Sequence, residues 1–409
     1  MTNPEKKYKF FLHPHIYYNK IGSKFLLYNT KNGDCIESDS LECSGLIESV
    51  YIPENLGVID IYESQLEKKE IIDFIRIIKE KGFGKLDETG PDTLPVVNLL
   101  PILNLQTDIE RLKKNNESLT DNVQNYLNEM NIYINEHCDL GCSDCKLHYK
   151  QVRSCYRSDD NRFLALVEIK KILDEASNSL LKKVNLLGGN IYLYPHLKEL
   201  MALLNEYQFE FHFWVHYKNL IEYTLLNSNI HKDILVTFPI DEVVVLELLD
   251  RHRQSKFHFI VETEAQVDEI EQVLQGNFDN YTIMPIFNGR NLQFFKENIY
   301  LEKQDIFSTT ISQREIFRNQ KLNSNFFGKL YVLPDGSVKA NMNSAILGNI
   351  NTNSLLEIIY LELHKNTAWR KVRDEEPCSA CLYQFLCPAP SNYEMVISEP
   401  NLCNILEDN

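Results

Sequence analysis

The chain has no long apolar segment. Its most apolar stretch, Leu94 to Leu105, is too short to span a bilayer and is interrupted by Pro95 and Pro101. The first residues, MTNPEKKYKFFLHPH, carry basic side chains with no sustained apolar stretch behind them, so no secretory signal is visible. We therefore expect a cytoplasmic protein that does not associate with a membrane.

Basic residues are also in deficit. The chain has 42 Lys and Arg against 58 Asp and Glu, which gives a net charge of −16. Nucleic acids and anionic membranes attract basic patches, so this balance argues against both as partners. Hydrophobic residues make up 44% and aromatic residues 11%, enough for a substantial core. A length of 409 residues suggests two or three domains.

Cysteine, in contrast, is abundant. In a cytosolic chain, ten cysteines are more often metal ligands than disulfide partners. Three of them, Cys35, Cys43 and Cys155, stand apart and are expected to be small apolar residues. The remaining seven fall into two groups: Cys138, Cys142 and Cys145, and then Cys378, Cys381, Cys387 and Cys403.

The first group has the spacing C-x3-C-x2-C. Three soft thiolates this close together can bind one soft metal centre. A fully ligated iron–sulfur cluster normally takes four cysteines. Three cysteines would leave one iron open to another ligand, and an open position is where a metal centre can do chemistry.

Strands and helices alternate through the central part of the chain. This alternation predicts a parallel sheet or barrel, whose functional site lies at the carboxyl ends of the strands. The first cysteine group follows the first of these strands, and Gly188-Gly189-Asn190 follows the second. We therefore expect both motifs at one rim. The expected strands are 130–135, 183–187, 209–217, 234–238, 257–262 and 281–287, with helices at 163–177 and 195–207.

This combination of motifs resembles radical SAM enzymes. The resemblance implies a partial (β/α)6 barrel and a [4Fe–4S] cluster on the three cysteines of the first group. S-adenosylmethionine (SAM) would chelate the open iron and be cleaved to a 5′-deoxyadenosyl radical. Gly188 and Gly189 would allow the backbone to approach the methionine part of SAM, with Asn190 beside them. Thr237, Asp241 and Glu262 follow strand ends and could contact its ribose or amino group.

Two positions depart from the family pattern. Asp144 replaces an aromatic residue, and Asn190 replaces a glutamate that accepts from the amino group of SAM. Asparagine retains a carbonyl acceptor but has no charge, and charge-assisted hydrogen bonds are about twice as strong as neutral ones. Some members of the superfamily are degenerate partners of an active enzyme, which gives an alternative without catalysis.

The second cysteine group is a complete four-ligand set. By spacing alone, C-x2-C-x5-C with a later Cys403 could bind zinc or an iron–sulfur cluster. After a radical SAM-like core it resembles a SPASM domain, which implies an auxiliary [4Fe–4S] cluster. Asn341 and Ser391 occupy positions where that family has cysteines of a second auxiliary cluster. We therefore expect one auxiliary site.

The N-terminal part has a hairpin signal. Asn32-Gly33 lies between an apolar run at 25–28 and a return strand at 35–38. Ser40 is expected to cap a helix that continues to Val50, and a second helix is expected over 63–81. This order resembles winged-helix elements that bind leader peptides, which can add an extended peptide to a sheet edge. A structural cap is the alternative.

On the strand expected at 209–217, His212 and His216 share one face. We expect them to be hydrogen-bonded histidines of the barrel interior rather than ligands.

Together these patterns predict an α/β protein in three parts. A small α+β winged-helix-like domain would occupy 1–115, a partial (β/α)6 radical SAM-type barrel 116–320, and a SPASM-like cysteine domain 321–409. The functional hypothesis is maturation of a ribosomally made precursor peptide with cleavage of SAM. The alternative is a non-catalytic accessory protein that binds the precursor peptide for a separate maturase.

Overall fold

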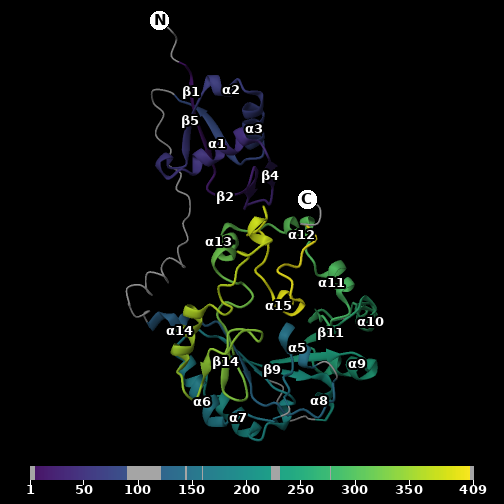
Figure 1. Ribbon diagram of the computed structural model, residues 1–409. Coiled ribbons are helices and arrows are strands. Elements are labelled where there is room, and N and C mark those ends of the chain that lie inside the picture. Colours follow the sequence, from purple (N-terminus) through teal and green to yellow (C-terminus); the bar gives the residue numbers. More distant parts are fainter. Residues whose placement is uncertain are drawn as a thin grey trace.

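The computed structural model describes residues 5–89, 121–142, 145–158, 160–222, 231–276 and 278–405. The apolar segment 94–105, the expected domain boundary near residue 115 and Asp144 lie outside these residues. No helix in the described ranges is both long and apolar enough to span a bilayer. The N-terminal domain lies at one end of the molecule and the large sheet at the other (Figure 1).

The N-terminal domain contains two three-stranded antiparallel sheets, with the orders β5-β1-β6 and β2-β3-β4. Its helices pack on these sheets through an apolar core that includes Phe10, Phe25 and Ile47. Its elements are β1 (Lys7–Leu12), β2 (Ile16–Ile21), β3 (Lys24–Asn29), β4 (Cys35–Ser38), α1 (Leu41–Tyr51), η1 (Pro53–Asn55), β5 (Val58–Tyr62), α2 (Glu63–Leu66), α3 (Lys69–Glu80) and β6 (Gly84–Glu88).

The expected hairpin is confirmed as β3 and β4, with Tyr28 opposite Cys35. Gly33 in its turn has a φ of +83°, which glycine adopts without a steric penalty. The cap of α1 is also confirmed, because Ser40 Oγ accepts a hydrogen bond from Cys43 N at 3.1 Å. The helix expected over 63–81 is interrupted and forms α2 and α3. The sheet of β1, β5 and β6 was not predicted, and the winged-helix likeness stays a prediction.

The large sheet has nine strands in the order β12-β11-β10-β9-β8-β7-β13-β14-β15. Strands β7 to β12 are parallel and follow chain order, which confirms the expected parallel α/β architecture. The strands are β7 (Glu129–Tyr133), β8 (Lys183–Leu187), β9 (Glu210–His216), β10 (His231–Thr237), β11 (Lys256–Val261), β12 (Tyr281–Pro285), β13 (Lys329–Val332), β14 (Ser337–Lys339) and β15 (Gly348–Asn349).

The sheet continues past the boundary expected after residue 320. Strand β13 pairs parallel to β7, and β14 and β15 add antiparallel strands beyond it. The Asp335-Gly336 dipeptide predicts a hairpin over 329–339. This hairpin is confirmed as β13 and β14, and it belongs to the same sheet as the six parallel strands. The three-part division of the chain stays a prediction.

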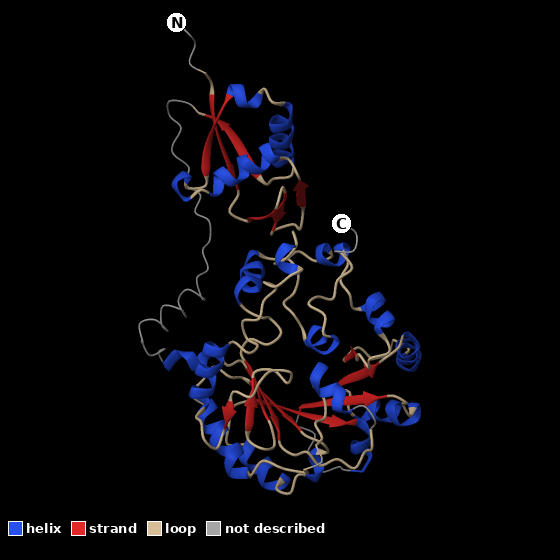
Figure 2. Ribbon diagram, viewed as in Figure 1, coloured by secondary structure: helices blue, strands red, loops and turns tan. Residues whose placement is uncertain are grey.

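The two faces of the sheet follow from the period-two alternation of strand side chains. On β7, Met130 and Ile132 pack into the core beneath the helices, whereas Asn131 and Tyr133 point to the opposite, concave face. Figure 2 shows helices arranged around the outer side of the strands. These are η2 (Asp121–Tyr126), α6 (Leu166–Ala176), η3 (Ile191–Leu193), α7 (Leu197–Leu204), α8 (Tyr217–Glu222), α9 (Glu242–Arg251) and α10 (Glu264–Leu274). Helix α5 (Cys145–Gln151) lies on the concave face instead, where Tyr149 packs with Tyr133 and Leu187.

The C-terminal region combines short helices with extended segments. The sequence after Ser354 predicts a helix that continues to about Arg373. This helix is α14, and it ends at Lys365, so the predicted end is wrong. Asn366 adopts a left-handed conformation with a φ of 52°, and the Glu362 carboxylate accepts hydrogen bonds from Ala368 N and Trp369 N at 2.9 and 2.7 Å. The helices of this region are α11 (Leu292–Asn298), α12 (Lys303–Phe307), α13 (Gln313–Lys321), α14 (Leu355–Lys365), η4 (Cys378–Ala380) and α15 (Asn392–Ile397).

The N-terminal hairpin contacts the C-terminal region, as Figure 1 also shows. Leu26 and Tyr28 of β3 pack with Cys381 and Leu386. Asn19 Nδ2 donates to the carbonyl oxygen of Leu382 at 2.9 Å. Segments near the two ends of the described chain therefore share one apolar cluster.

Replacing Glu362 should destabilise the C-terminal region. The Glu362 side chain is 0% exposed, and its carboxylate accepts a hydrogen bond from Thr367 N at 3.1 Å. In Glu362→Gln, an amide N–H would replace one acceptor oxygen and would face the Thr367 N–H, so that two donors would meet. We expect the free energy of unfolding in urea to fall by about 2 kcal/mol. The exposed Glu399→Gln variant should change it by less than about 0.5 kcal/mol. Equal effects in the two variants would contradict this account.

Candidate functional site

The loop after β7 and the loop after β8 are joined by backbone hydrogen bonds. Gly189 N donates to the carbonyl oxygen of Asn135 at 3.0 Å, and Asn190 N donates to that of His137 at 2.6 Å. The Asn135 side chain donates to the carbonyl oxygen of Asn190 at 2.8 Å. The structure therefore brings the cysteine loop and the glycine loop to the same rim of the sheet.

The two glycines are required by this contact. A Cβ atom at Gly188 would overlap the Asn135 side chain, and one at Gly189 would overlap the backbone of His137. Glycine is the residue that permits such a close backbone approach. The chain's own packing therefore explains Gly188 and Gly189. Contact of these glycines with SAM stays a prediction.

A buried carboxylate fixes the start of the cysteine loop. Glu136 is almost fully buried and accepts hydrogen bonds from Ser158 Oγ at 2.5 Å and Arg162 N at 3.0 Å. Its second oxygen lies 3.5 Å from the Arg162 guanidinium. Charge-assisted bonds of this kind hold the loop in one position before the first cysteine of the motif.

The three cysteines of the motif line one cavity, as their spacing predicted. A hydrogen bond between the Cys145 and Cys142 thiols lowers the pKa of Cys142 and raises that of Cys145, and burial raises the pKa of Cys138. The cavity is lined by Cys138, Leu140, Cys142, Cys145, His148, Ser154, Cys155, His216, Leu235, Thr237 and Ile260.

The cavity has a donor set suited to an iron–sulfur cluster. Within the described part of the chain, no three Cys, His, Asp or Glu side chains are arranged to bind a single metal ion. A four-iron cluster is a larger body with soft iron and sulfide atoms, and cysteine thiolates are its usual ligands. The Ser154 hydroxyl, 2% exposed as a residue, also lines the cavity and has no partner among the described residues. These residues fit a cluster, and their ligation stays a prediction.

Asn190 is already engaged within the chain. Its side-chain oxygen accepts from Tyr192 N at 3.1 Å, and its amide donates to Asp139 Oδ1 at 3.2 Å. The residue is 0% exposed and caps η3. The side-chain oxygen and nitrogen of Asn190 are therefore both hydrogen-bonded within the chain.

A larger cavity of about 690 Å³ adjoins the cysteines. Thr237 and Glu262 line it, in agreement with their expected place at strand ends. Asp241 does not line it, because its carboxylate accepts from Val244 N at 3.2 Å and caps α9. The lining is Leu140, Gly141, Cys142, His148, Lys218, Thr237, Phe238, Pro239, Ile260, Glu262, Gln266 and Glu269.

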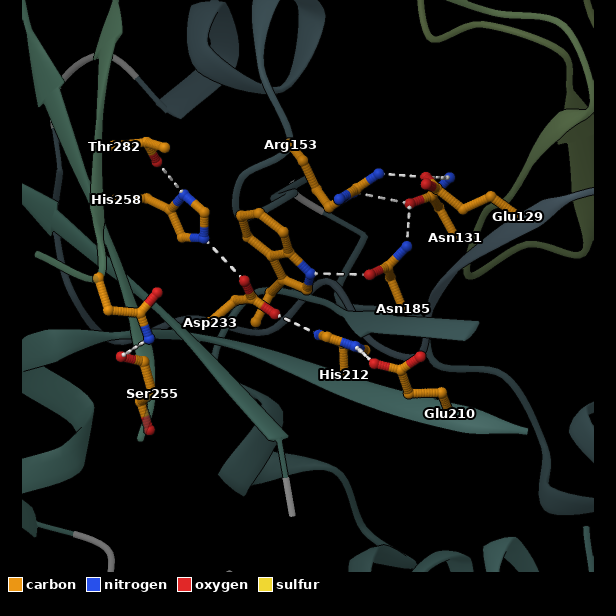
Figure 3. Close-up of polar contacts among 12 residues, drawn as sticks. Glu129, Asn131, Arg153, Asn185, Glu210, His212, Asp233, Ser255, His258 and Thr282 are labelled. Carbon is orange, nitrogen blue, oxygen red and sulfur yellow. Dashed lines mark hydrogen bonds and ion pairs between the residues drawn. The ribbon is translucent and has the colours of Figure 1, made fainter. Parts of the chain in front are cut away.

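Below this rim, a polar network fills the concave face of the sheet (Figure 3). Asp233 on β10 lies between two histidines, 2.7 Å from His212 Nδ1 on β9 and 2.8 Å from His258 Nε2 on β11. His216 lies 2.9 Å from the hydroxyl of Thr237. The expectation of hydrogen-bonded interior histidines is therefore confirmed.

The network extends across the sheet to β7. Arg153 forms an ion pair with Glu129 and donates to Asn131 Oδ1 at 2.8 Å. Asn185 joins this group to Trp214, whose indole N–H donates to Asn185 Oδ1 at 3.1 Å. The Arg153 guanidinium also lies 4.8 Å from the centre of the Trp214 ring. These hydrogen bonds pair polar groups of β7, β8 and β9 with Arg153, and the Trp214 ring stacks on His258 with 4.5 Å between the ring centres.

Burial shapes the ionisation of this interior. Burial opposes the charge of Asp233, but hydrogen bonds from His212 and His258 outweigh it and lower the pKa of Asp233. Burial lowers the pKa of His258 and lowers that of His216 to about 4. The interior therefore combines an ionised aspartate with histidines whose charging is disfavoured.

The second cysteine group also lines one cavity. Cys378, Cys381, Cys387 and Cys403 come together there, as the spacing predicted, and their binding of iron–sulfur or zinc stays a prediction. Arg373 Nη1 lies 3.7 Å from Cys378 Sγ.

Arg373 also ties this group to α15. Its guanidinium pairs with Glu394 at 2.8 Å and donates to the carbonyl oxygen of Pro388 at 2.6 Å. Both members of the ion pair are buried. The positive charge of Arg373 therefore lies beside Cys378, whose thiol would become a negatively charged thiolate on binding a metal.

Asn341, where the SPASM resemblance would expect a cysteine, belongs to an amide network, and Ser391, the other such position, caps α15. Asn341 donates to Asn392 Oδ1 at 2.6 Å, and Ser391 Oγ accepts from Tyr393 N at 3.2 Å as the cap of α15. Asn343 and Asn392 donate to the carbonyl oxygens of Lys150 and Gln151. Hydrogen bonds therefore connect this region directly to α5.

No protein-family model matches the chain, and no curated protein matches it. Among solved structures, the chain is similar to Streptococcus suis SuiB bound to precursor peptide SuiA, with 13% identity, a TM-score of 0.44 and coverage of 96% of this chain and 98% of that chain. SuiB bound to S-adenosylmethionine gives 13% identity, a TM-score of 0.40 and the same coverage. Histidine-tagged anSMEcpe with bound AdoMet gives 12% identity, a TM-score of 0.44 and coverage of 67% and 92%. Similarity at this level of identity and TM-score assigns no activity to the chain.

Cys155 is the site residue that sequence reasoning missed. It lines the cavity of the motif cysteines instead of standing apart as a core residue. Burial, followed by the nearby Cys138 and Cys142, raises the pKa of Cys155 to about 12. Its only signal in the sequence was its closeness along the chain to Cys145.

A methyl group at position 189 should separate the two rim loops. Gly189→Ala would press its Cβ against the His137 carbonyl, and we expect the free energy of unfolding in urea to fall by about 1–3 kcal/mol. Gly141→Ala is the matched control, because nothing lies within 4 Å of its Cβ position. If Gly141→Ala lowered the free energy of unfolding by the same amount, the cause would be the reduced backbone freedom of alanine and not the contact between position 189 and His137.

Removing the Asp233 carboxylate should leave two buried histidines without their shared partner. We expect Asp233→Ala to lower the free energy of unfolding by about 3 kcal/mol at pH 7. Since folding lowers the pKa of Asp233, its stabilisation is present above the unfolded pKa of about 3.9 and is lost as the pH falls below it. Urea unfolding at pH 7, 5 and 3 should show the difference from wild type shrinking at pH 3.

The exposed Asp250→Ala variant is the control for that series and should stay close to wild type at each pH. A difference for Asp233→Ala that grows towards pH 3 would have the wrong sign for a lowered pKa.

Proposed function

We propose that this protein is a radical SAM-like iron–sulfur protein that acts in the maturation of a ribosomally made peptide. The observation that carries the proposal is the convergence of Cys138, Cys142 and Cys145 on one cavity at the carboxyl end of the parallel strands. A cavity of about 690 Å³ directly beside Cys142 has room for a ligand of the size of SAM.

The cavity offers groups for each part of SAM. Lys218 would attract its carboxylate, and Glu262 would accept from its amino group or ribose hydroxyls. Phe238 and Ile260 would pack against the adenine, which is apolar on its faces. Cys138, Cys142 and Cys145 would hold a [4Fe–4S] cluster, which supplies the electron for cleavage of SAM when bound.

The C-terminal cysteines would hold a second, auxiliary cluster. Their four thiols surround one cavity, so a metal centre there would be fully ligated and would support the fold or relay electrons. Zinc is the alternative occupant, since four thiolates also suit a structural zinc ion. The precursor peptide would be bound by the N-terminal domain, whose β3 contacts the segment that carries these cysteines.

A second candidate function is a non-catalytic protein that binds the precursor peptide for a separate maturase. The engagement of Asn190 with Tyr192 and Asp139 favours it, because the usual charged acceptor for SAM is absent. Metal analysis and SAM cleavage separate the two candidates.

Anaerobic reconstitution of the full chain tests the proposal. Two [4Fe–4S] clusters require roughly eight irons per chain, and one cluster with zinc requires about four irons and one zinc. After reduction with SAM present, we expect 5′-deoxyadenosine from the wild type. The Cys138→Ala/Cys142→Ala double variant should lose about four irons and all cleavage, whereas Cys35→Ser, in the N-terminal hairpin, should retain both.

Two clusters without cleavage under a strong reductant would reject the catalytic function and leave the accessory one. In that event, the Asn190→Glu variant tests whether the missing carboxylate at position 190 prevents cleavage. Cleavage of SAM by this variant would show that Asn190 is the cause of the inactivity. If the Cys138→Ala/Cys142→Ala double variant retained all of its iron, the cluster assignment itself would be rejected.

A further inference from the structure

Cys155 lies with the three motif cysteines around one cavity. It comes from a different segment, beyond the end of the helix α5 that begins at Cys145. Its side chain is partly buried and packs with the apolar residues of the concave face. Four thiols, rather than three, therefore surround the space in which a cluster would lie.

The chain returns Cys155 to this cavity through a short helix and a fixed turn. Helix α5 runs only from Cys145 to Gln151, and Val152 N continues it by donating to the carbonyl oxygen of His148 at 2.9 Å. Tyr156 N then donates to the carbonyl oxygen of Gly188 at 3.0 Å. The residue after Cys155 is thereby bonded to the same glycine loop that positions the motif.

Ser154 gives an independent sign of a ligand in this space. Its hydroxyl is buried, lines the same cavity and has no hydrogen-bond partner among the described residues. A buried hydroxyl without a partner costs about 1–3 kcal/mol, so such groups normally have an acceptor. A cluster sulfide or thiolate in the cavity would supply that acceptor.

We propose that Cys155 ligates the fourth iron of the cluster held by Cys138, Cys142 and Cys145 when SAM is not bound. This inference rests on the proposed cluster at the site, and it is independent of whether SAM is cleaved. A set of four thiolates is the complete complement for a [4Fe–4S] cluster. The iron that the sequence motif leaves open would then be closed by the chain itself.

The ligand exchange involves no redox change. On binding iron, the Cys155 thiol loses its proton to solvent, one iron–sulfur bond forms and the bond from that iron to a solvent molecule breaks. For SAM to chelate that iron, its amino group, after losing a proton, and its carboxylate would have to replace Cys155, whose thiolate would take up a proton. Cys155 would thus compete with SAM for one coordination position.

The test uses oxidation of the reconstituted full chain and reads the cluster by EPR. An iron without a cysteine ligand is the one lost on mild oxidation, which leaves a [3Fe–4S] cluster with its own signal. We expect almost no such signal from the wild type and about one [3Fe–4S] cluster per chain from Cys155→Ser. The auxiliary cluster contributes none, because all four of its irons would have cysteine ligands.

Cys35→Ser is the matched control, a partly buried cysteine of β4 that lines neither cysteine cavity, and should behave as wild type. Cys155→Ala should repeat the result of Cys155→Ser, and unchanged iron at the auxiliary site would show that both variants fold. A wild type that already yields about one [3Fe–4S] cluster, or a Cys155→Ser variant that yields none, would overturn the inference. Clusters that behave as expected without any cleavage of SAM would reject only the catalytic function.

Discussion

The site depends on one close backbone contact, in which the loop that leaves β7 lies directly against Gly188 and Gly189. Any side chain at either position would overlap Asn135 or His137. Hydrogen bonds from Gly189 and Asn190 to that loop, and the buried carboxylate of Glu136 behind it, determine where the cysteine motif begins. Since Tyr156 also bonds to Gly188, the same contact positions the segment that carries Cys155. Both sides of the proposed cluster site therefore depend on two residues without side chains.

The parts of the fold that could be predicted are those encoded by local patterns. The parallel strands follow from alternation with helices, and the two cysteine groups follow from spacing alone. The contacts that were missed join separate strands or turns. Asp233 meets His212 and His258 only because three parallel strands pair in one particular register. Helix α14 ends at Lys365, and the Glu362 side chain accepts hydrogen bonds from Ala368 N and Trp369 N in the segment that follows. The spacing of apolar residues along the sequence does not predict such a side-chain contact.

The N-terminal hairpin and the C-terminal cysteines form one structural unit despite their separation in sequence. Tyr28 packs against Phe307, and its hydroxyl accepts from Ile311 N at 2.8 Å. Leu26 of the same strand shares an apolar cluster with Cys381 and Cys387. A metal bound by those cysteines would therefore stabilise the surface on which the N-terminal domain rests. Metal binding and the placement of the N-terminal domain are physically linked by this arrangement, because binding to the folded state shifts its stability.

Side-chain amides connect the region around Asn341 to α5. Asn341, Asn343 and Asn392 use amide groups to bond one another and the end of α5. Neutral amides in a satisfied network give fixed geometry without the charge of a cluster. Since α5 begins at Cys145, this network positions the third motif cysteine from the C-terminal side, while the β7 loop positions the first from the other. The cysteine cavity is therefore fixed from both directions by hydrogen bonds of the chain itself.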